Sequence, residues 1–210
     1  MTAAAGCCYS LFLIAPLLGS RLDPARSYVS ELAALDQPAS TVFRLVDMVV
    51  GVVVGVAGLV AARAGGRRWD WAGLWFVVFG IGTVLDSAAP MSCAPSSGPG
   101  CPVGEGSGLA DLVGAHELTS LISNVAVLVA MALVARSWWS RRGAGLRATV
   151  LQRACVPSLP VAAVTGLVAV LQATVFGGLG SWVGWAQRVQ VLTISIVVVA
   201  LGVSLLRGDG

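Results

Sequence analysis

Long apolar stretches separated by short polar connections constrain this chain more than any other feature. Six stretches approach the length that an α-helix needs to cross a bilayer, about 20 residues. They cover residues 3–20, 42–62, 71–89, 112–135, 154–176 and 182–206. Hydrophobic residues make up 57% of the 210 residues and charged residues only 11%, against about a quarter in soluble domains. The sequence therefore predicts an all-α fold, a single polytopic transmembrane helix bundle with about six spans.

The composition narrows the setting of this predicted membrane domain. All thirteen basic residues are arginine, a bias typical of a GC-rich, actinobacteria-like genome, so we expect a bacterial plasma-membrane protein. The net charge of +3 is small and the arginines form no single stripe, which argues against nucleic acid as a partner. No phosphate-binding glycine loop, haem pair or CxxC motif occurs, so we expect no cofactor. Membrane lipids are the expected partners, and the oligomeric state stays open.

The arginines are distributed unequally between the two sides of the predicted spans. With the N-terminus in the cytoplasm, nine of the thirteen fall on the cytoplasmic side: Arg63, Arg67, Arg68, Arg136, Arg141, Arg142, Arg147, Arg153 and Arg207. Only Arg21, Arg26, Arg44 and Arg188 remain on the outer side. Because cytoplasmic loops carry an excess of Lys and Arg, this distribution favours both termini in the cytoplasm.

Two cysteines lie in the loop that this orientation places outside. Cys93 and Cys101 are eight positions apart in a stretch rich in Gly, Pro and Ser. In an oxidising compartment we expect a disulfide between them, which would close and stiffen the loop. Metal binding by the pair is the alternative, but no histidine or further cysteine lies nearby, and we expect no metal site.

Polar residues gather near the outer ends of the predicted spans. Residues 112–135 contain a polar stripe that falls within about 120° of arc on a helix, formed by His116, Glu117, Ser120, Ser123 and Asn124. Asp86 lies near the end of the third span, and Gln187 and Arg188 lie near the start of the sixth. Arg44 and Asp47 share one face of the second span at i, i+3 spacing. Because such side chains are costly against lipid, we expect an outward-facing polar pocket.

The segment between the first two spans is predicted to cover this pocket. Asp23-Pro24 is typical of a helix start, and Tyr28, Leu32 and Leu35 recur at helical spacing. We therefore expect a short interfacial helix with Ser27, Ser30 and Glu31 on its water-facing side. The predicted ligand-binding residues are Ser27, Ser30, Glu31, Asp86, His116, Glu117, Gln187 and Arg188.

Residues 26–34, RSYVSELAA, carry a resemblance to a known family. They resemble the S-x-Y-[IV]-S-E-L-G-A segment of an uncharacterised bacterial membrane family, domain of unknown function 998, with Ala33 in the place of the usual glycine. The stretch from Asp86 to Ser96 is similar to the acidic, proline- and cysteine-containing loop of that family. His116 and the pair Gln187-Arg188 resemble the polar residues that open its fourth and sixth helices. The resemblance implies a six-helix architecture and assigns no chemistry.

Two functions from different classes remain open. The first is a protein that binds or moves a lipid or other amphiphile, with the head group held by Arg188, Asp86 and His116. The second is a membrane-embedded hydrolase or transferase acting on a lipid or isoprenoid, with Asp86, His116 and Ser120 as candidate catalytic residues. Structural roles are the alternative for the same side chains. His116 would then bond to an acidic neighbour, and Asp86 would pair with Arg188 to hold the third and sixth spans together.

Overall fold

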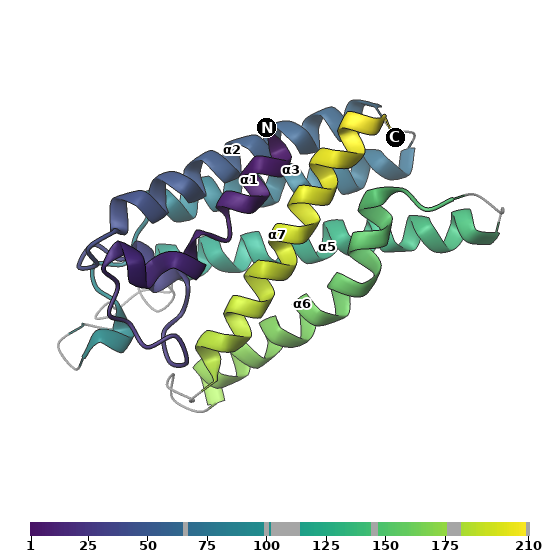
Figure 1. Cartoon of the computed structure of the whole chain (residues 1–210). Coiled ribbons are helices and arrows are strands. Elements are labelled where there is room, and N and C mark those ends of the chain that lie inside the picture. The colour runs from purple at the N-terminus through teal and green to yellow at the C-terminus, as the bar shows by residue number, and fades with distance from the viewer. Residues whose placement is uncertain (65–66, 99–100, 102–113, 144–146, 176–181, 209–210) are drawn as a thin grey trace.

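The computed structural model describes residues 1–64, 67–98, 101, 114–143, 147–175 and 182–208, and these residues form a helix bundle without strands (Figure 1). Five of its helices are long and apolar enough to cross a membrane. They are α2 (Ser40–Ala64), α3 (Arg67–Ala88), α5 (Ala115–Gly143), α6 (Val150–Val175) and α7 (Val183–Arg207). Residues 112–113 and 176, at the ends of two predicted spans, lie outside the described residues. The prediction of a polytopic helix bundle is confirmed.

The first predicted span, residues 3–20, is not one continuous helix. It forms the short helix α1 (Thr2–Cys8) and the 3-10 helix η1 (Leu11–Leu18), with a break at Tyr9 and Ser10. Pro16 has no N–H and would clash with the carbonyl of Phe12 in an α-helix, so this half of the segment adopts tighter turns. Gly19 ends η1 with a φ of 87°, a left-handed conformation that glycine adopts without strain. The expectation of a regular first helix is therefore wrong.

The chain from Ala3 to Pro24 nevertheless runs in the opposite direction to α7. The helix α1 lies beside the C-terminal half of α7 (Figure 1), and the residues that follow η1 reach the beginning of α7. A Cβ on Gly202 would lie 2.5 Å from the backbone nitrogen of Ala3, and a Cβ on Gly184 would lie 2.2 Å from the carbonyl oxygen of Pro24. Gly6 packs against α7 between these two contacts. The helix rises about 27 Å from Gly184 to Gly202, close to the ~30 Å thickness of a bilayer core. The chain from Ala3 to Pro24, rather than residues 3–20 alone, thus covers about the thickness of a bilayer core.

Glycines bring α2 and α3 into close contact. A Cβ on Gly80 would lie 2.4 Å from the carbonyl oxygen of Gly51, and a Cβ on Gly58 would lie 2.6 Å from that of Gly73. Small residues at such crossings let two helix backbones approach within a membrane. The main buried core forms around this pair of helices and includes Val50, Phe76, Val127, Met131 and Val197.

The segment between η1 and α2 closes one end of the bundle. It contains η2 (Ser30–Ala33), a single 3-10 turn in place of the longer interfacial helix that the sequence suggests. Leu32 packs with Phe12 and Phe43 in a second apolar cluster, which draws the turn inward. Ser27 and Glu31 are consequently buried, at 0% and 1% exposure, so the prediction that they face water is wrong.

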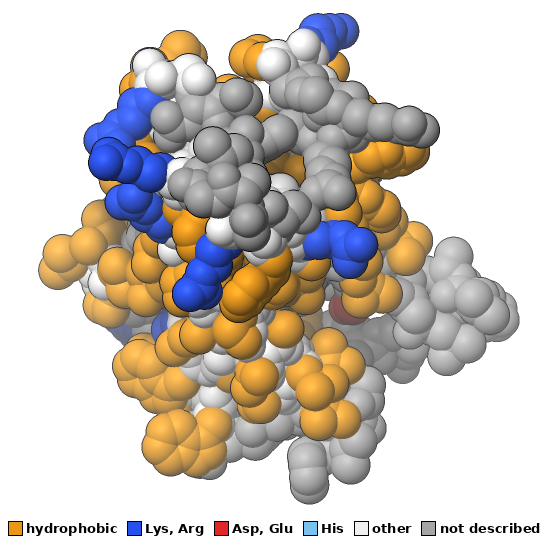
Figure 2. All heavy atoms as spheres, turned by 90° about the vertical axis from the view of Figure 1, so that its right-hand side faces the viewer, with side chains coloured by type: hydrophobic (Ala, Val, Ile, Leu, Met, Phe, Trp, Pro, Cys, Tyr) orange, Lys and Arg blue, Asp and Glu red, His pale blue; other side chains and the backbone are white. Residues whose placement is uncertain are grey.

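The opposite end of the bundle is basic. The arginines that are exposed there are Arg63, Arg136, Arg142, Arg147, Arg153 and Arg207, and Figure 2 shows arginine side chains on this end. The C-terminal part of α7 reaches the same end, and Ala3 lies beside it. Both described ends of the chain therefore lie toward the arginine-rich end, in agreement with the charge pattern of the sequence. That this end faces the cytoplasm stays a prediction.

Candidate functional site

A polar cavity lies among α2, α3, α5 and α7, beside the break between α1 and η1. Its volume is about 80 Å³, room for a few water molecules. Its polar wall comprises Ser30, Asp47, Thr83, Asp86, Ser120, Ser123, Asn124, Gln187 and Gln190. Its other wall comprises Cys8, Tyr9, Leu11, Phe12, Val29, Phe43, Val46, Phe79, Val191 and Ile194. A small polar space thus lies within the apolar part of the bundle.

Asp86, in the last turn of α3, is held by the beginning of α5. Its Oδ1 accepts hydrogen bonds from the hydroxyls of Thr119, at 2.5 Å, and Ser120, at 2.9 Å. His116 Nδ1 lies 3.1 Å from the same oxygen, without the geometry of a hydrogen bond. The polar stripe of α5 therefore meets α3 through one carboxylate oxygen.

Asp47, on α2, faces the same cavity. Its side chain is partly exposed, and it forms no hydrogen bond or ion pair with any described residue. Arg44, one turn earlier, does not pair with it: Arg44 Nε donates to the carbonyl oxygen of Ser87 at 3.0 Å and so joins α2 to α3. Two carboxylates therefore share one small space, and no arginine or histidine is among the described residues that line it.

The Arg188 side chain does not line the cavity, and it binds backbone carbonyls instead of a carboxylate. Its Nη1 donates to the carbonyl oxygens of Pro24, at 2.7 Å, Ser27, at 2.8 Å, and Gly184, at 3.1 Å. No ion pair with Asp86 is present among the described residues. The prediction that Asp86 pairs with Arg188 is wrong. The segment before η2 places the carbonyl oxygens of Pro24 and Ser27 next to the guanidinium, and these take the place of a carboxylate.

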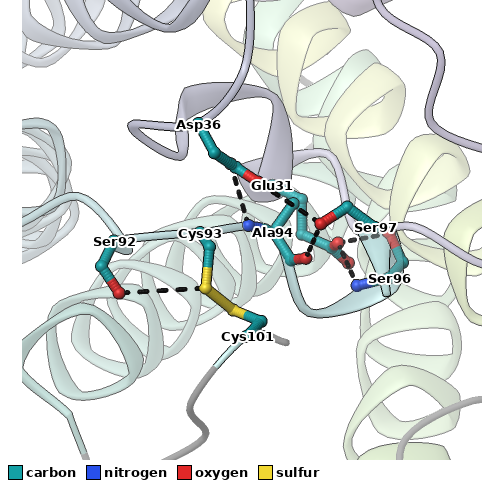
Figure 3. The surroundings of a disulfide bond; sticks show 8 residues. All are labelled: Glu31, Asp36, Ser92, Cys93, Ala94, Ser96, Ser97 and Cys101. Atoms are coloured by element: carbon teal, nitrogen blue, oxygen red, sulfur yellow. Dashed lines mark hydrogen bonds between the residues drawn. A yellow bond between two sulfur atoms is a disulfide. The ribbon is translucent and has the colours of Figure 1, made fainter. Parts of the chain in front are cut away.

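Glu31 has a structural role at the loop that follows α3. Its Oε1 accepts from the backbone N–H of Tyr28 at 2.8 Å, and its Oε2 accepts from the N–H of Ser96 at 2.9 Å and from the Ser96 hydroxyl. Asp36 binds the same loop through the N–H of Ala94, at 3.0 Å (Figure 3). Glu31 therefore fastens the loop to the segment around η2 and does not line the cavity.

The cysteines of that loop lie at bonding distance. The sulfur atoms of Cys93 and Cys101 are 1.89 Å apart, and their Cα atoms are 5.7 Å apart (Figure 3). The structure thus contains the disulfide that the external placement predicts. Glu31 and Asp36 hold the described part of this loop against the segment around η2, and the disulfide closes the loop on itself.

The predicted site residue Glu117 lies away from the polar wall, and so does Tyr28, which the sequence places in the interfacial segment. Glu117 is exposed on α5. Tyr28 is half-buried, and its hydroxyl oxygen is buried without a hydrogen-bond partner. Burial, and secondarily the Glu31 carboxylate, raise the pKa of the Tyr28 phenol, which therefore stays protonated at neutral pH.

The candidate catalytic residues do not form a serine-hydrolase triad. Such a triad needs an imidazole between the serine hydroxyl and the carboxylate. Here Ser120 donates directly to Asp86, and His116 Nδ1 approaches the same oxygen of Asp86. The carboxylate lies between the hydroxyl and the imidazole, so this geometry does not activate Ser120. Among the described residues, no group of three or more His, Cys, Asp or Glu side chains is placed to hold a metal ion.

The sequence predicts several residues of the cavity wall but does not predict Asp47. Ser30, Asp86, Ser120 and Gln187 line the cavity, while Asp47 was considered only as a neighbour of Arg44. A signal was present, since a lone carboxylate in an apolar span is by default a candidate for function. Gln187 lines the cavity and also accepts a hydrogen bond from the N–H of Val29, which joins α7 to the segment around η2.

Comparison with known proteins places the chain in a family. Residues 2–204 match the model of a family described as protein of unknown function (DUF998). Neither the curated proteins nor the solved structures contain a match to the chain.

Proposed function

The chain belongs to the DUF998 family of proteins of unknown function, and from its cavity we propose that it binds or moves a lipid or other amphiphile. It does so as a multi-pass protein of the bacterial plasma membrane, with both termini in the cytoplasm. The positive-inside rule supports this orientation, which places the cavity near the outer face. The head group occupies the polar cavity, and the apolar part of the ligand stays outside it.

The observation that carries this proposal is the pair of carboxylates, Asp47 and Asp86, facing one cavity at the depth of the spans. An ionisable side chain within a membrane helix is costly, and such groups commonly mark ligand or ion pathways. Binding sites for small molecules combine apolar walls with a few convergent polar groups, and this cavity has both.

The size of the cavity limits what can enter it. A volume of about 80 Å³ holds a few water molecules, so we assign only the head group to the cavity. Cys8 lines the cavity and is also exposed, which supports a lateral opening beside α1. Leu13 and Leu17 of η1 are exposed nearby in the chain, at 59% and 83%, and offer an apolar surface for the rest of the ligand.

A matched pair of substitutions on α2 tests the proposal. Val46 lines the cavity, whereas Val49 is 57% exposed away from it. Val46→Phe fills space in the cavity, and Val49→Phe adds the same volume on the exposed surface of the bundle. We expect mass spectrometry of lipid extracts to find an amphiphile with the wild type and Val49→Phe, and much less of it with Val46→Phe. Equal amounts in both variants would contradict binding in this cavity.

The same preparation separates binding from catalysis. No nucleophile is activated by the arrangement of Ser120, Asp86 and His116. We therefore expect a bound amphiphile to be recovered chemically unchanged after incubation. Conversion of that molecule in a single turnover would favour the membrane-embedded enzyme instead.

A further inference from the structure

The hydrogen-bond donors of the cavity wall are largely engaged with the protein itself. The hydroxyl of Thr83 donates to the carbonyl of Phe79 at 2.9 Å, and that of Ser123 donates to the carbonyl of Thr119 at 2.8 Å. The Asn124 amide donates to the carbonyl of Ser120 at 2.8 Å. The Ser120 hydroxyl is bound to Asp86. A ligand here meets few free donors on the side of α3 and α5.

Acceptors on the same side are free. Asp47 has no partner among the described residues, and neither Asp86 Oδ2 nor Asn124 Oδ1 accepts a hydrogen bond from them. Asp47 lies on α2, Asp86 on α3 and Asn124 on α5, so the free acceptors converge from three helices. On the side of η2 and of the break after α1, the hydroxyls of Ser30 and Tyr9 and the amide nitrogen of Gln187 keep donors but carry no charge.

The nearby positive charges are occupied. Arg44 donates to the carbonyl of Ser87, and Arg188 donates to the carbonyls of the segment before η2. Neither side chain lines the cavity. His116 approaches Asp86 and leaves Asp47 without a counter-charge.

Aromatic rings complete the wall. Tyr9, Phe12, Phe43 and Phe79 line the cavity, and the rings of Tyr9 and Phe79 meet edge to face with centroids 6.3 Å apart. Aromatic side chains attract organic cations through the negative faces of their rings. Carboxylates and aromatic rings together form a wall that suits a cation and repels an anion.

Resting on the proposed function, we propose that the head group is an organic ammonium, bound between Asp47 and Asp86. A primary ammonium brings one positive charge and three N–H donors, which matches the free acceptors of the wall. An amine-bearing amphiphile and a small free amine share this chemistry. The negative charge of Asp47 favours an ammonium, would repel a phosphate and has no counterpart in a neutral head group.

Cys8 gives a direct measurement of occupancy. It lines the cavity and is exposed, whereas the adjacent Cys7 is exposed and does not line it. In maltoside micelles, the rate of maleimide labelling at Cys8 is followed relative to Cys7 in the same molecule, so changes in micelle charge cancel. The probes are dodecylammonium, dodecanol, dodecyl sulfate and methylammonium.

We expect dodecylammonium to protect Cys8 and dodecanol and dodecyl sulfate not to do so. Asp47→Asn should raise the concentration needed for half-protection about tenfold or more, because a charge-assisted hydrogen bond is lost. Glu117→Gln removes the same charge from an exposed position on α5 and should leave that concentration unchanged. Asp47→Asn should not lower the melting temperature, since Asp47 has no partner to lose.

The other outcomes distinguish the two proposals. Equal protection by dodecanol or dodecyl sulfate, unaffected by Asp47→Asn, would overturn the ammonium site and leave amphiphile binding standing. Protection by methylammonium but not by dodecylammonium would keep the ammonium site and overturn amphiphile binding. Protection by none of the four would overturn both.

Discussion

The Arg188 guanidinium of α7 donates a hydrogen bond to the carbonyl oxygen of Ser27, 2.8 Å away. The same nitrogen reaches the carbonyls of Pro24 and Gly184. At Gly184 the two backbones are so close that a Cβ would lie 2.5 Å from the Ser27 carbonyl oxygen. One buried arginine thus fastens the segment before η2 to the start of α7.

These contacts predict independent effects at Arg188 and Asp86. Arg188→Gln should lower the free energy of unfolding by about 1.5–3 kcal/mol or more, because hydrogen bonds from a charged group are lost. Asp86→Asn disturbs the separate contact with α5. The double variant should lose the sum of the two within about 0.5 kcal/mol. Denaturant titration of all four proteins measures this, and a sum that is clearly not additive would show that the residues meet.

The crossing of α2 and α3 predicts different costs for two glycine substitutions. Gly80→Ala would place a Cβ 2.4 Å from the Gly51 carbonyl oxygen, whereas the nearest atom to a Cβ on Gly55 is 3.9 Å away. Both changes give the helix a similar gain in propensity, about 1 kcal/mol. We expect Gly80→Ala to lower the melting temperature and Gly55→Ala to keep or raise it. A similar effect of both would contradict the close crossing.

The thiols should fall into three classes. Cys7 and Cys8 are exposed and should react with maleimide in the native protein, and Cys155 is buried and should not. Reduction should add Cys93 and Cys101. Mass spectrometry of the labelled protein counts the reacted thiols. Labelling of Cys93 and Cys101 before reduction would refute the disulfide.

Tyr28→Phe should not destabilise the protein. The hydroxyl oxygen of Tyr28 is buried without a partner, and an unsatisfied buried polar group costs about 1–3 kcal/mol. Its removal should leave the melting temperature unchanged or raise it. A clear decrease would indicate that the hydroxyl forms a hydrogen bond in solution.

Reporter fusions test the orientation. Gly143 ends α5 at the basic end of the bundle, and Gly98 lies within the loop that the Cys93–Cys101 disulfide closes, at the other end. A fusion at Gly143 should report a cytoplasmic position and one at Gly98 an external position. The reverse pattern would invert the topology and place the cavity near the inner face.

Membrane character, the positions of five long helices and the cysteine pair could be read from the sequence, because each depends on residues that are close together in the chain. A run of apolar residues long enough to span a bilayer needs no knowledge of its neighbours. Hydropathy alone does not predict the structure of residues 3–20. It indicates one span, but Pro16 favours a 3-10 helix in the second half of the segment.

Tertiary structure alone decided which polar groups meet. Helical periodicity places Asp86, His116 and Ser120 on particular faces, but it does not say which helix each face contacts. A charged residue near a span is expected to pair with a carboxylate, yet the partners of Arg188 are backbone carbonyls. Every residue carries such a carbonyl, and no sequence pattern marks which one will be used. Asp47 lacks an arginine partner for the same reason. In the fold, Arg44 donates to the carbonyl of Ser87, and the Asp47 carboxylate faces the cavity.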